Sequence, residues 1–151
     1  MQVSYSNSIY YSVRLTSRYL KAFIAQVLER LNAEISSDEV FTLDILKCNG
    51  SMCQRDLAKL LFRDRANTGK IAKSLENKGF IEIQADKKNN RMIKKLSLTE
   101  KGKVFLDELA EKSAPILDKI TSQISEIEYK TLQNMLCKVR NNMSTIIEKQ
   151  N

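Results

Sequence analysis

The chain has 151 residues, of which 42% are hydrophobic and 28% charged, a composition typical of a folded globular protein. It has no histidine and only four glycines. This excludes histidine-based catalysis, most zinc or iron sites and a glycine-rich phosphate loop. No apolar run has the roughly 18 residues needed to cross a bilayer, and the first residues lack a signal-peptide core. We therefore expect a cytoplasmic protein that is no enzyme, needs no cofactor or metal and contacts no membrane.

Positive charge is concentrated in residues 51–103. This segment holds 14 of the 25 Lys and Arg residues but six of the 18 acids, so it carries +8 while the rest of the chain sums to −1. A charge run is often no more than a solvated face. On a small helical unit, however, such a concentrated positive field is typical of proteins that bind DNA phosphates.

Apolar residues mostly recur every three or four positions, which predicts a largely helical chain. One long helix is expected over residues 8–31. Ser36 and Glu39 have the spacing of a capping box and begin a second helix, which ends near Asn49–Gly50. A short third helix is predicted over Gln54–Leu61.

The next segment is predicted to be a helix followed by a hairpin. Asp64 is placed to cap a fourth helix that ends at Gly79. Two β-like runs follow, Phe80–Ala85 and Met92–Leu98, and the polar residues Asp86–Asn90 form the tip between them. Helix, turn, helix and hairpin in this order are typical of a winged helix-turn-helix.

The rest of the chain is expected to be helical again. Thr99 caps a fifth helix, and Pro115 should kink or divide it near Glu111. Ser125 and Glu128 form a second capping box before the last helix, whose apolar residues have nearly heptad spacing. The predicted fold class is mainly α with a small β-hairpin.

The outward side of the fourth helix carries residues suited to a DNA major groove. Placing its apolar residues inward turns the polar ones outward. Asn67 then suits an adenine edge, Lys70 a guanine, and Ser74 a base or a phosphate. Phosphate contacts are predicted from Gln54 and Arg55. The predicted DNA-contacting residues of the helix itself are Arg65, Asn67, Thr68, Gly69, Lys70, Lys73 and Ser74.

Gly69 and the hairpin tip each allow two interpretations. Glycine inside a helix costs about 1 kcal/mol relative to alanine, so Gly69 is either a tolerated weak spot or a point of close approach to DNA. In the hairpin, Lys87, Lys88, Asn90 and Arg91 are placed to enter a minor groove, where the potential is most negative. The alternative for the tip is a plain solvated turn.

Two long apolar helices lie near the ends of the chain. They either pack on each other within one subunit or interlock with those of a second copy. A winged unit of roughly 50 residues buries too little surface to cover both. We therefore predict a homodimer, which presents two recognition helices about one DNA turn apart, roughly 34 Å.

Several segments resemble the MarR family of bacterial winged helix-turn-helix transcription regulators, in the right order and over nearly the whole chain. They are ISSDEV (35–40), RDLA (55–58), DRANTGK (64–70), LENKGFI (75–81), NR (90–91), LTEKG (98–102) and ISEIE (124–128).

The resemblance implies a triangular homodimer that binds a palindromic operator. Residues 35–102 are then the DNA-binding domain, and residues 1–34 and 103–151 form the dimerisation region. Arg91 is implied as the wing arginine in the minor groove. Two departures weaken individual contacts: Asn89 stands where the family usually has an acid, and Gly69 stands where it commonly has a hydroxyl residue.

The resemblance also implies control by a small aromatic ligand that releases the protein from DNA. We expect the cleft for this ligand to be lined by Tyr10, Tyr11, Phe23, Phe41 and Phe105. The alternative is that these aromatic residues belong to the hydrophobic core. Redox sensing is the other option, and Cys53 is the candidate residue. It lies at the start of the third helix near Arg55, and we expect both the helix dipole and this cation to favour its thiolate. Cys48 and Cys137 are expected to be ordinary small apolar residues.

Together these features predict a homodimeric repressor that binds double-stranded DNA specifically. One alternative is a winged-helix module for protein–protein interaction, which the lysines on the fourth helix disfavour because protein interfaces are depleted in lysine. Another is an enzyme using Asp38 and Glu39, which we interpret as capping residues instead.

Overall fold

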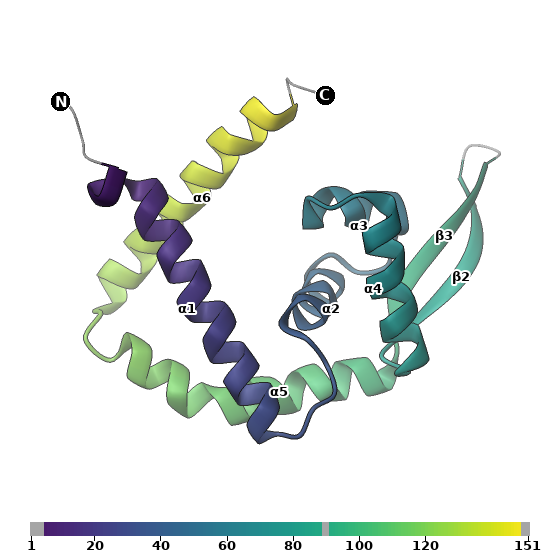
Figure 1. Ribbon diagram of the computed structural model, residues 1–151, viewed down its shortest axis with the longest axis horizontal. Helices are drawn as coiled ribbons and strands as arrows, with labels where there is room; N and C mark the ends of the chain where they lie inside the picture. Colours follow the sequence, from purple (N-terminus) through teal and green to yellow (C-terminus); the bar gives the residue numbers. More distant parts are fainter. Residues whose placement is uncertain (1–4, 89–90, 149–151) are drawn as a thin grey trace. The chain divides into compact units, whose positions relative to one another are not determined.

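The computed structural model describes residues 5–88 and 91–148, with the backbone alone for Lys88, Arg91 and Glu148 (Figure 1). The chain forms two compact units, residues 1–110 and 111–151. In chain order the elements are η1 (Tyr5–Asn7), α1 (Ile9–Arg30), α2 (Ser37–Asn49), β1 (Met52–Cys53), α3 (Gln54–Leu61), α4 (Arg65–Asn77), β2 (Ile81–Lys88), β3 (Arg91–Leu98), α5 (Glu100–Thr121) and α6 (Glu126–Glu148). The prediction of a mainly helical chain with a small antiparallel sheet is confirmed.

The first two helices begin and end where local sequence signals predict. Ser8 caps α1 with its side chain. At the start of α2, the N–H of Glu39 donates to Ser36 Oγ at 3.2 Å, and the N–H of Ser36 donates to Glu39 Oε2 at 2.7 Å. α2 ends at Gly50, whose φ of 74° lies in the left-handed region that glycine adopts without a steric penalty. The capping box therefore does what its spacing predicts.

The sheet differs from the predicted two-stranded hairpin in two ways. A third strand, β1, lies beside β3, with Met52 opposite Leu96, so the strand order is β1-β3-β2. A strand of two residues is too short to show the alternation by which strands are recognised. The hairpin strands are also longer than predicted, because backbone pairing continues through the polar residues to Lys88 opposite Arg91. Asp86 therefore belongs to β2 and not to the tip.

The core of the first unit lies between α2, α3, α4, the sheet and the start of α5. Its largest fully buried apolar side chains are those of Leu43, Leu46, Leu57, Leu75, Ile81 and Leu96, and Leu106 of α5 is buried beside them. Burying one such side chain contributes about 1.5–3 kcal/mol. Every element of the helix-turn-helix contributes to this core, which fixes the inner side of α4.

A close contact joins the start of α5 to the end of α4. Thr99 Oγ1 accepts a hydrogen bond from the N–H of Gly102 at 3.1 Å and donates one to the carbonyl of Gly79 at 2.6 Å. A Cβ at Gly102 would lie 2.2 Å from the carbonyl oxygen of Phe80. Glycine is therefore required at position 102, and Thr99 caps α5 as predicted.

The C-terminal helices partly confirm the sequence. α5 is not divided at Pro115 but runs through it, because the missing N–H removes a single hydrogen bond from a long helix. α6 begins at the predicted capping box, where the N–H of Ser125 donates to Glu128 Oε2 at 2.9 Å. Within residues 5–88 and 91–148, none of the helices combines the length and hydropathy that crossing a bilayer demands.

Candidate nucleic-acid interface

A tight turn at residues 62–64 joins α3 to α4 and sets the start of α4. Phe62 adopts a left-handed conformation with a φ of 49°. Asp64 then caps α4, its Oδ1 accepting a hydrogen bond from the N–H of Asn67 at 2.8 Å. The hydrogen bonds from the backbone and side chain of Asn67 lower the pKa of Asp64. Both the predicted turn and the predicted cap are confirmed.

The inner side of α4 holds one residue that the sequence had assigned to DNA. Ala72 and Leu75 are fully buried, as predicted, but Thr68 is also 0% exposed. Its Oγ1 donates to the carbonyl of Asp64 at 2.9 Å. The prediction of a DNA contact from Thr68 is therefore wrong. Positions 68, 72 and 75 share one helical face, so the 3.6-residue period already contained this information.

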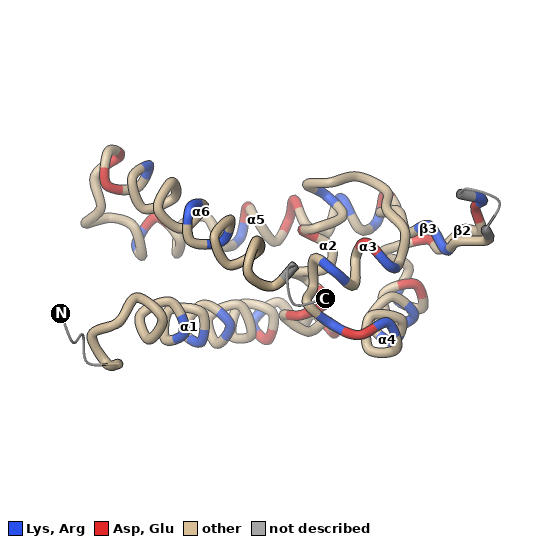
Figure 2. The backbone as a smooth tube through the Cα atoms, turned by 90° about the horizontal axis from the view of Figure 1, so that it is seen from above, with Lys and Arg blue, Asp and Glu red and all other residues tan. Residues whose placement is uncertain are grey.

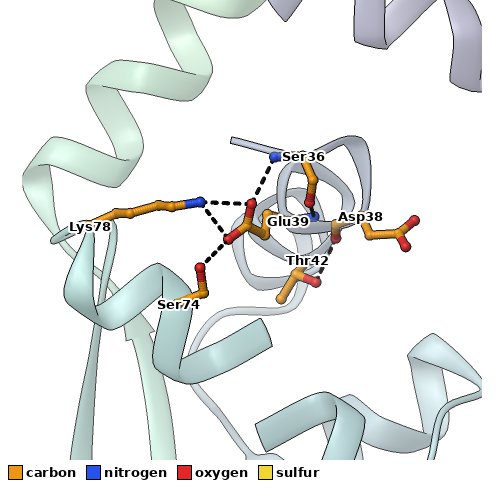
Figure 3. A network of polar contacts seen from close by, with 6 residues as sticks. All are labelled: Ser36, Asp38, Glu39, Thr42, Ser74 and Lys78. Atoms are coloured by element: carbon orange, nitrogen blue, oxygen red, sulfur yellow. Dashed lines mark hydrogen bonds and ion pairs between the residues drawn. The ribbon is translucent and has the colours of Figure 1, made fainter. Parts of the chain in front are cut away.

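The C-terminal half of α4 is tied to the start of α2 by a buried carboxylate (Figure 3). The side chain of Glu39 is 8% exposed. Lys78 Nζ lies 2.8 and 2.9 Å from its two oxygens, and Ser74 Oγ donates to Oε1 at 2.6 Å. Together with the N–H of Ser36, these donors surround the carboxylate. Burial raises the pKa of Glu39, but the hydrogen bonds from Lys78, Ser36 and Ser74 outweigh it and lower the pKa to about 2.

This network corrects the assignment of Ser74. The helical period placed Ser74 on the outward face, whereas its hydroxyl points inward to Glu39. A contact from Ser74 to a base or phosphate is therefore wrong for this geometry. No local signal in the sequence points to the network, because Ser74 on α4 and Lys78 just after it are 35 and 39 positions from Glu39.

The outer side of α4 is polar and open. Its exposed side chains with cationic or amide groups are those of Arg65, Asn67, Lys70 and Lys73. Figure 2 shows the Lys and Arg positions along the backbone of α4 in blue. Asn67 Nδ2 donates to Asp64 Oδ2 at 2.6 Å. Lys73, although 68% exposed, donates to Glu76 at 2.8 Å, and this hydrogen bond is the main cause of the lowered pKa of Glu76.

A cleft of about 690 Å³ lies against this outer side. It is lined by Gln54, Ala66, Gly69, Lys70, Lys73, Glu76, Ile83, Ala85 and Lys94. Lys94 comes from β3, where it lies opposite Ala85 in the register, and sequence reasoning did not identify it. The strand register, which the sequence does not reveal, brings its ammonium group into one opening with Lys70 and Lys73. A shallow opening with three cations suits a polyanion.

The structure explains the glycine at position 69 in a way that neither interpretation from the sequence predicted. A Cβ there would lie 3.0 Å from Gln54 Nε2. This nitrogen donates to the carbonyl of Arg65 at 3.2 Å, so the side chain of Gln54 crosses from α3 to α4 at Gly69. Gln54 therefore lies on the outer side of α4, whereas its neighbour Arg55 is exposed on α3.

The predicted wing contacts are described in part. Lys87 is exposed at the end of β2, and the backbones of Lys88 and Arg91 pair with each other. The side chains of Lys88 and Arg91 lie outside the described part of the chain, as do Asn89 and Asn90. The wing contacts stay predictions.

A second ion-pair group, centred on Asp38, was not predicted. Asp38 lies 2.9 Å from Lys21 of α1 and 2.5 Å from Arg63 of the turn before α4. The sequence analysis interpreted Asp38 as a capping residue of α2. Its carboxylate instead bridges α1 to the helix-turn-helix. Exposed pairs of this kind contribute little stability each, roughly 0–1 kcal/mol.

The cysteines give no support to a redox site. Cys53 Sγ lies 3.0 Å from Asp56 Oδ2, so its neighbour is an acid and not the expected cation. Cys48 and Cys137 are free and exposed, in contrast to the apolar role expected for them. Within the described part of the chain, no cluster of three His, Cys, Asp or Glu residues is placed to hold a metal ion.

Two of the aromatic residues predicted to line a ligand cleft make ring contacts, and in both cases the partner ring lies outside the predicted set. Phe105 packs against Phe80 with ring centroids 4.8 Å apart, and Tyr11 packs against Tyr5 at 6.1 Å. Phe23 is half-buried, and Tyr10 and Phe41 are exposed. The core alternative holds for Phe105, and the cleft stays a prediction.

Comparison with known proteins gives the same fold and a family. A model of the MarR family matches residues 35–93. YybA of Bacillus subtilis (strain 168), an uncharacterized HTH-type transcriptional regulator, is 33% identical over 95 residues, which are 63% of this chain and 63% of that protein. The match thus spans less than two thirds of the relative's length.

Solved structures agree with the match. MepR of S. aureus in complex with DNA is 25% identical, with a TM-score of 0.71 over 93% of this chain and 99% of that one. NadR in complex with 4-hydroxyphenylacetate shares the fold, at 21% identity and a TM-score of 0.76 over 92% of this chain and 96% of that one. The family model covers α2, β1, α3, α4, β2 and the start of β3, so residues 35–93, which contain the helix-turn-helix, match the MarR family.

Proposed function

We propose that the protein is a transcriptional repressor that binds double-stranded DNA specifically, as a homodimer on a palindromic operator. Residues 35–102 are the DNA-binding domain, and residues 1–34 and 103–151 are the dimerisation region. A regulator of this kind acts where bacterial DNA is, in the cytoplasm.

The observation that carries the proposal is the exposed cationic side of α4. Arg65, Lys70 and Lys73 project from one helix whose opposite side is fixed in the core, and Lys94 adds a further cation from the sheet. A rigid helix with a cationic outer side fits the major groove and its phosphates. Supporting this, MepR, a relative at 25% identity, has been solved as a DNA complex.

Exposed apolar side chains support dimerisation. On α1 they are those of Ile9, Tyr10, Tyr11, Val13, Leu15, Tyr19 and Leu20. On α6 they are those of Ile127, Tyr129, Leu132, Met135, Met143, Ile146 and Ile147, and Ile127 is 79% exposed. Apolar surface of this extent on a helix marks an interface, and a two-fold dimer fits a palindromic site.

In this proposal, a small aromatic ligand releases the protein from DNA. The support comes from structural neighbours, since NadR was solved with 4-hydroxyphenylacetate, and BpsR of Bordetella bronchiseptica in a study of its regulation by 6-hydroxynicotinic acid. Both share the fold at low identity. The residues proposed to line the cleft in this chain are those predicted from the sequence.

Selection of bound duplexes from a random pool, followed by titration of the selected duplex against salt, tests the proposal. The logarithm of the affinity should fall linearly with the logarithm of the salt concentration, with a slope of about −0.9 per phosphate contacted. A palindromic duplex should keep an advantage of about 10³-fold or more over unrelated sequences. Equal affinity for every duplex would refute specific binding, and light scattering that shows a monomer would refute the dimer.

A further inference from the structure

A gap in the outer side of α4 is filled by a side chain from α3. An ideal Cβ at Gly69 would lie 3.0 Å from Nε2 and 4.0 Å from Cδ of Gln54. We call this space the Gly69 notch. A Cβ at position 69 would push the amide of Gln54 outward by a few tenths of an ångström, so glycine lets the amide lie at its present distance from α4.

The amide in the notch has a fixed orientation. Nε2 donates to the carbonyl of Arg65 at 3.2 Å, and since a carbonyl needs a donor, the nitrogen is the atom that faces it. A carboxamide has two N–H groups and one oxygen. One N–H and Oε1 therefore remain, since within the described part of the chain the amide's one hydrogen bond is that of Nε2 to Arg65.

These remaining groups lie on the proposed DNA-binding surface. Gln54 lines the same cleft as Lys70 and Lys73, and its side chain is half-buried. One N–H beside one oxygen is the complement of an adenine edge, which accepts at N7 and donates from N6. A phosphate offers acceptors alone, and it would leave Oε1 facing negative oxygens. The available groups therefore favour a base over the backbone.

We infer that Gln54 is a base-reading residue that recognises an adenine in each half-site through the Gly69 notch. This replaces the phosphate contact predicted from the sequence, and it rests on the proposed function. The residue comes from the first helix of the helix-turn-helix, so α3 and α4 contribute to one recognition surface.

The test compares full-length variants on the duplex selected by the wild type and on every single-base change of it. With Gln54→Ala, the preference for adenine at one position of each half-site should fall about 10- to 100-fold, the value of a lost bidentate pair. Gly69→Ala retains the glutamine but displaces its amide, so it should reduce the preference at the same position. The double variant should lose no more than Gln54→Ala alone.

Arg55→Ala is the matched control, since Arg55 is the exposed neighbour expected to contact phosphate. It should lower affinity for all duplexes by the same factor. A uniform loss with Gln54→Ala, or a preference unchanged in either single variant, would overturn the inference while the proposed function stands. A wild type that enriches no duplex would overturn both. Thermal unfolding confirms that each variant is folded.

Discussion

The lysines near the two ends of α4 have opposite roles. In the C-terminal half, Ser74 and the adjacent Lys78 turn toward the buried carboxylate of Glu39. In the N-terminal half, Asn67 and Lys70 are exposed, and Lys70 lines an open cleft. One end of the helix is thus fixed by charge, and the other is left accessible.

The difference shows that burial and partner, not residue type, decide what a lysine does. A lysine paired with a desolvated carboxylate stabilises the fold, because removing either member leaves a costly group without its partner. An exposed lysine contributes little to stability but is available to a ligand. Loss of stability and loss of DNA binding should therefore separate along α4.

The largest effect is expected from Glu39→Gln. The pKa of Glu39 lies at about 2, against a usual value of 4.5, so the folded state favours the charged form by about 3 kcal/mol. The substitution keeps the shape and removes the charge that Lys78 needs. The free energy of unfolding, measured in urea, should fall by about 3 kcal/mol.

Glu128→Gln is the matched control. Glu128 occupies the same capping-box position at the start of α6, accepting from the N–H and hydroxyl of Ser125, but it is exposed. Its substitution should cost much less stability. Equal losses in the two variants would show that Glu39 acts as a cap alone and that the network with α4 adds nothing.

Acid should remove the same stabilisation. Because the pKa of Glu39 is lower in the folded state, its contribution is complete above about pH 5 and is lost as the pH falls toward 2. The wild type should lose up to about 3 kcal/mol more than Glu39→Gln over this range. Using the difference removes the contributions of Asp64, Glu76 and Glu128, whose pKa values are also lowered. Parallel pH profiles would contradict the assignment.

The parts of this molecule that depend on local sequence were predictable. The capping boxes at Ser36 and Ser125, the cap at Asp64 and the helical spacing placed every α-helix of the described chain. The outward position of Lys70 and Lys73 followed from the same period. These features involve residues within about four positions of each other, where the physics is local.

The features that could not be predicted are contacts between residues far apart in the sequence. The carboxylate of Glu39 is recognisable as a cap but not as the partner of Lys78. The same holds for Lys94, which the strand register brings to the cleft, and for the amide of Gln54 at Gly69. The prediction for Ser74 was wrong for this reason, since the helical period predicts which side of the helix a residue lies on but not which residue its side chain contacts.

Lys70→Ala sharpens the comparison between the two halves of α4. It should weaken operator binding by about 1–3 kcal/mol and change the free energy of unfolding by no more than about 0.5 kcal/mol. Lys78→Ala should instead lower the free energy of unfolding, because Glu39 loses its cation, and should change operator affinity little. Arg91→Ala in the wing is expected to resemble Lys70→Ala. Titration of the operator and urea unfolding give both quantities, and a similar loss of stability in both lysine variants would contradict the division.

The smallest effect is expected from Gly69→Ala, and its sign is informative. Alanine in place of glycine inside a helix gains up to about 1 kcal/mol, and the group it meets is the far end of the flexible side chain of Gln54, which is able to move. Urea unfolding should therefore show a small stabilisation, even though base preference is reduced. Gly102→Ala is the control with the opposite sign, because its Cβ would meet the backbone carbonyl of Phe80 at 2.2 Å. If Gly69→Ala instead destabilises the fold, the amide of Gln54 is structural, and its place on the surface serves the joint between α3 and α4 and not the DNA.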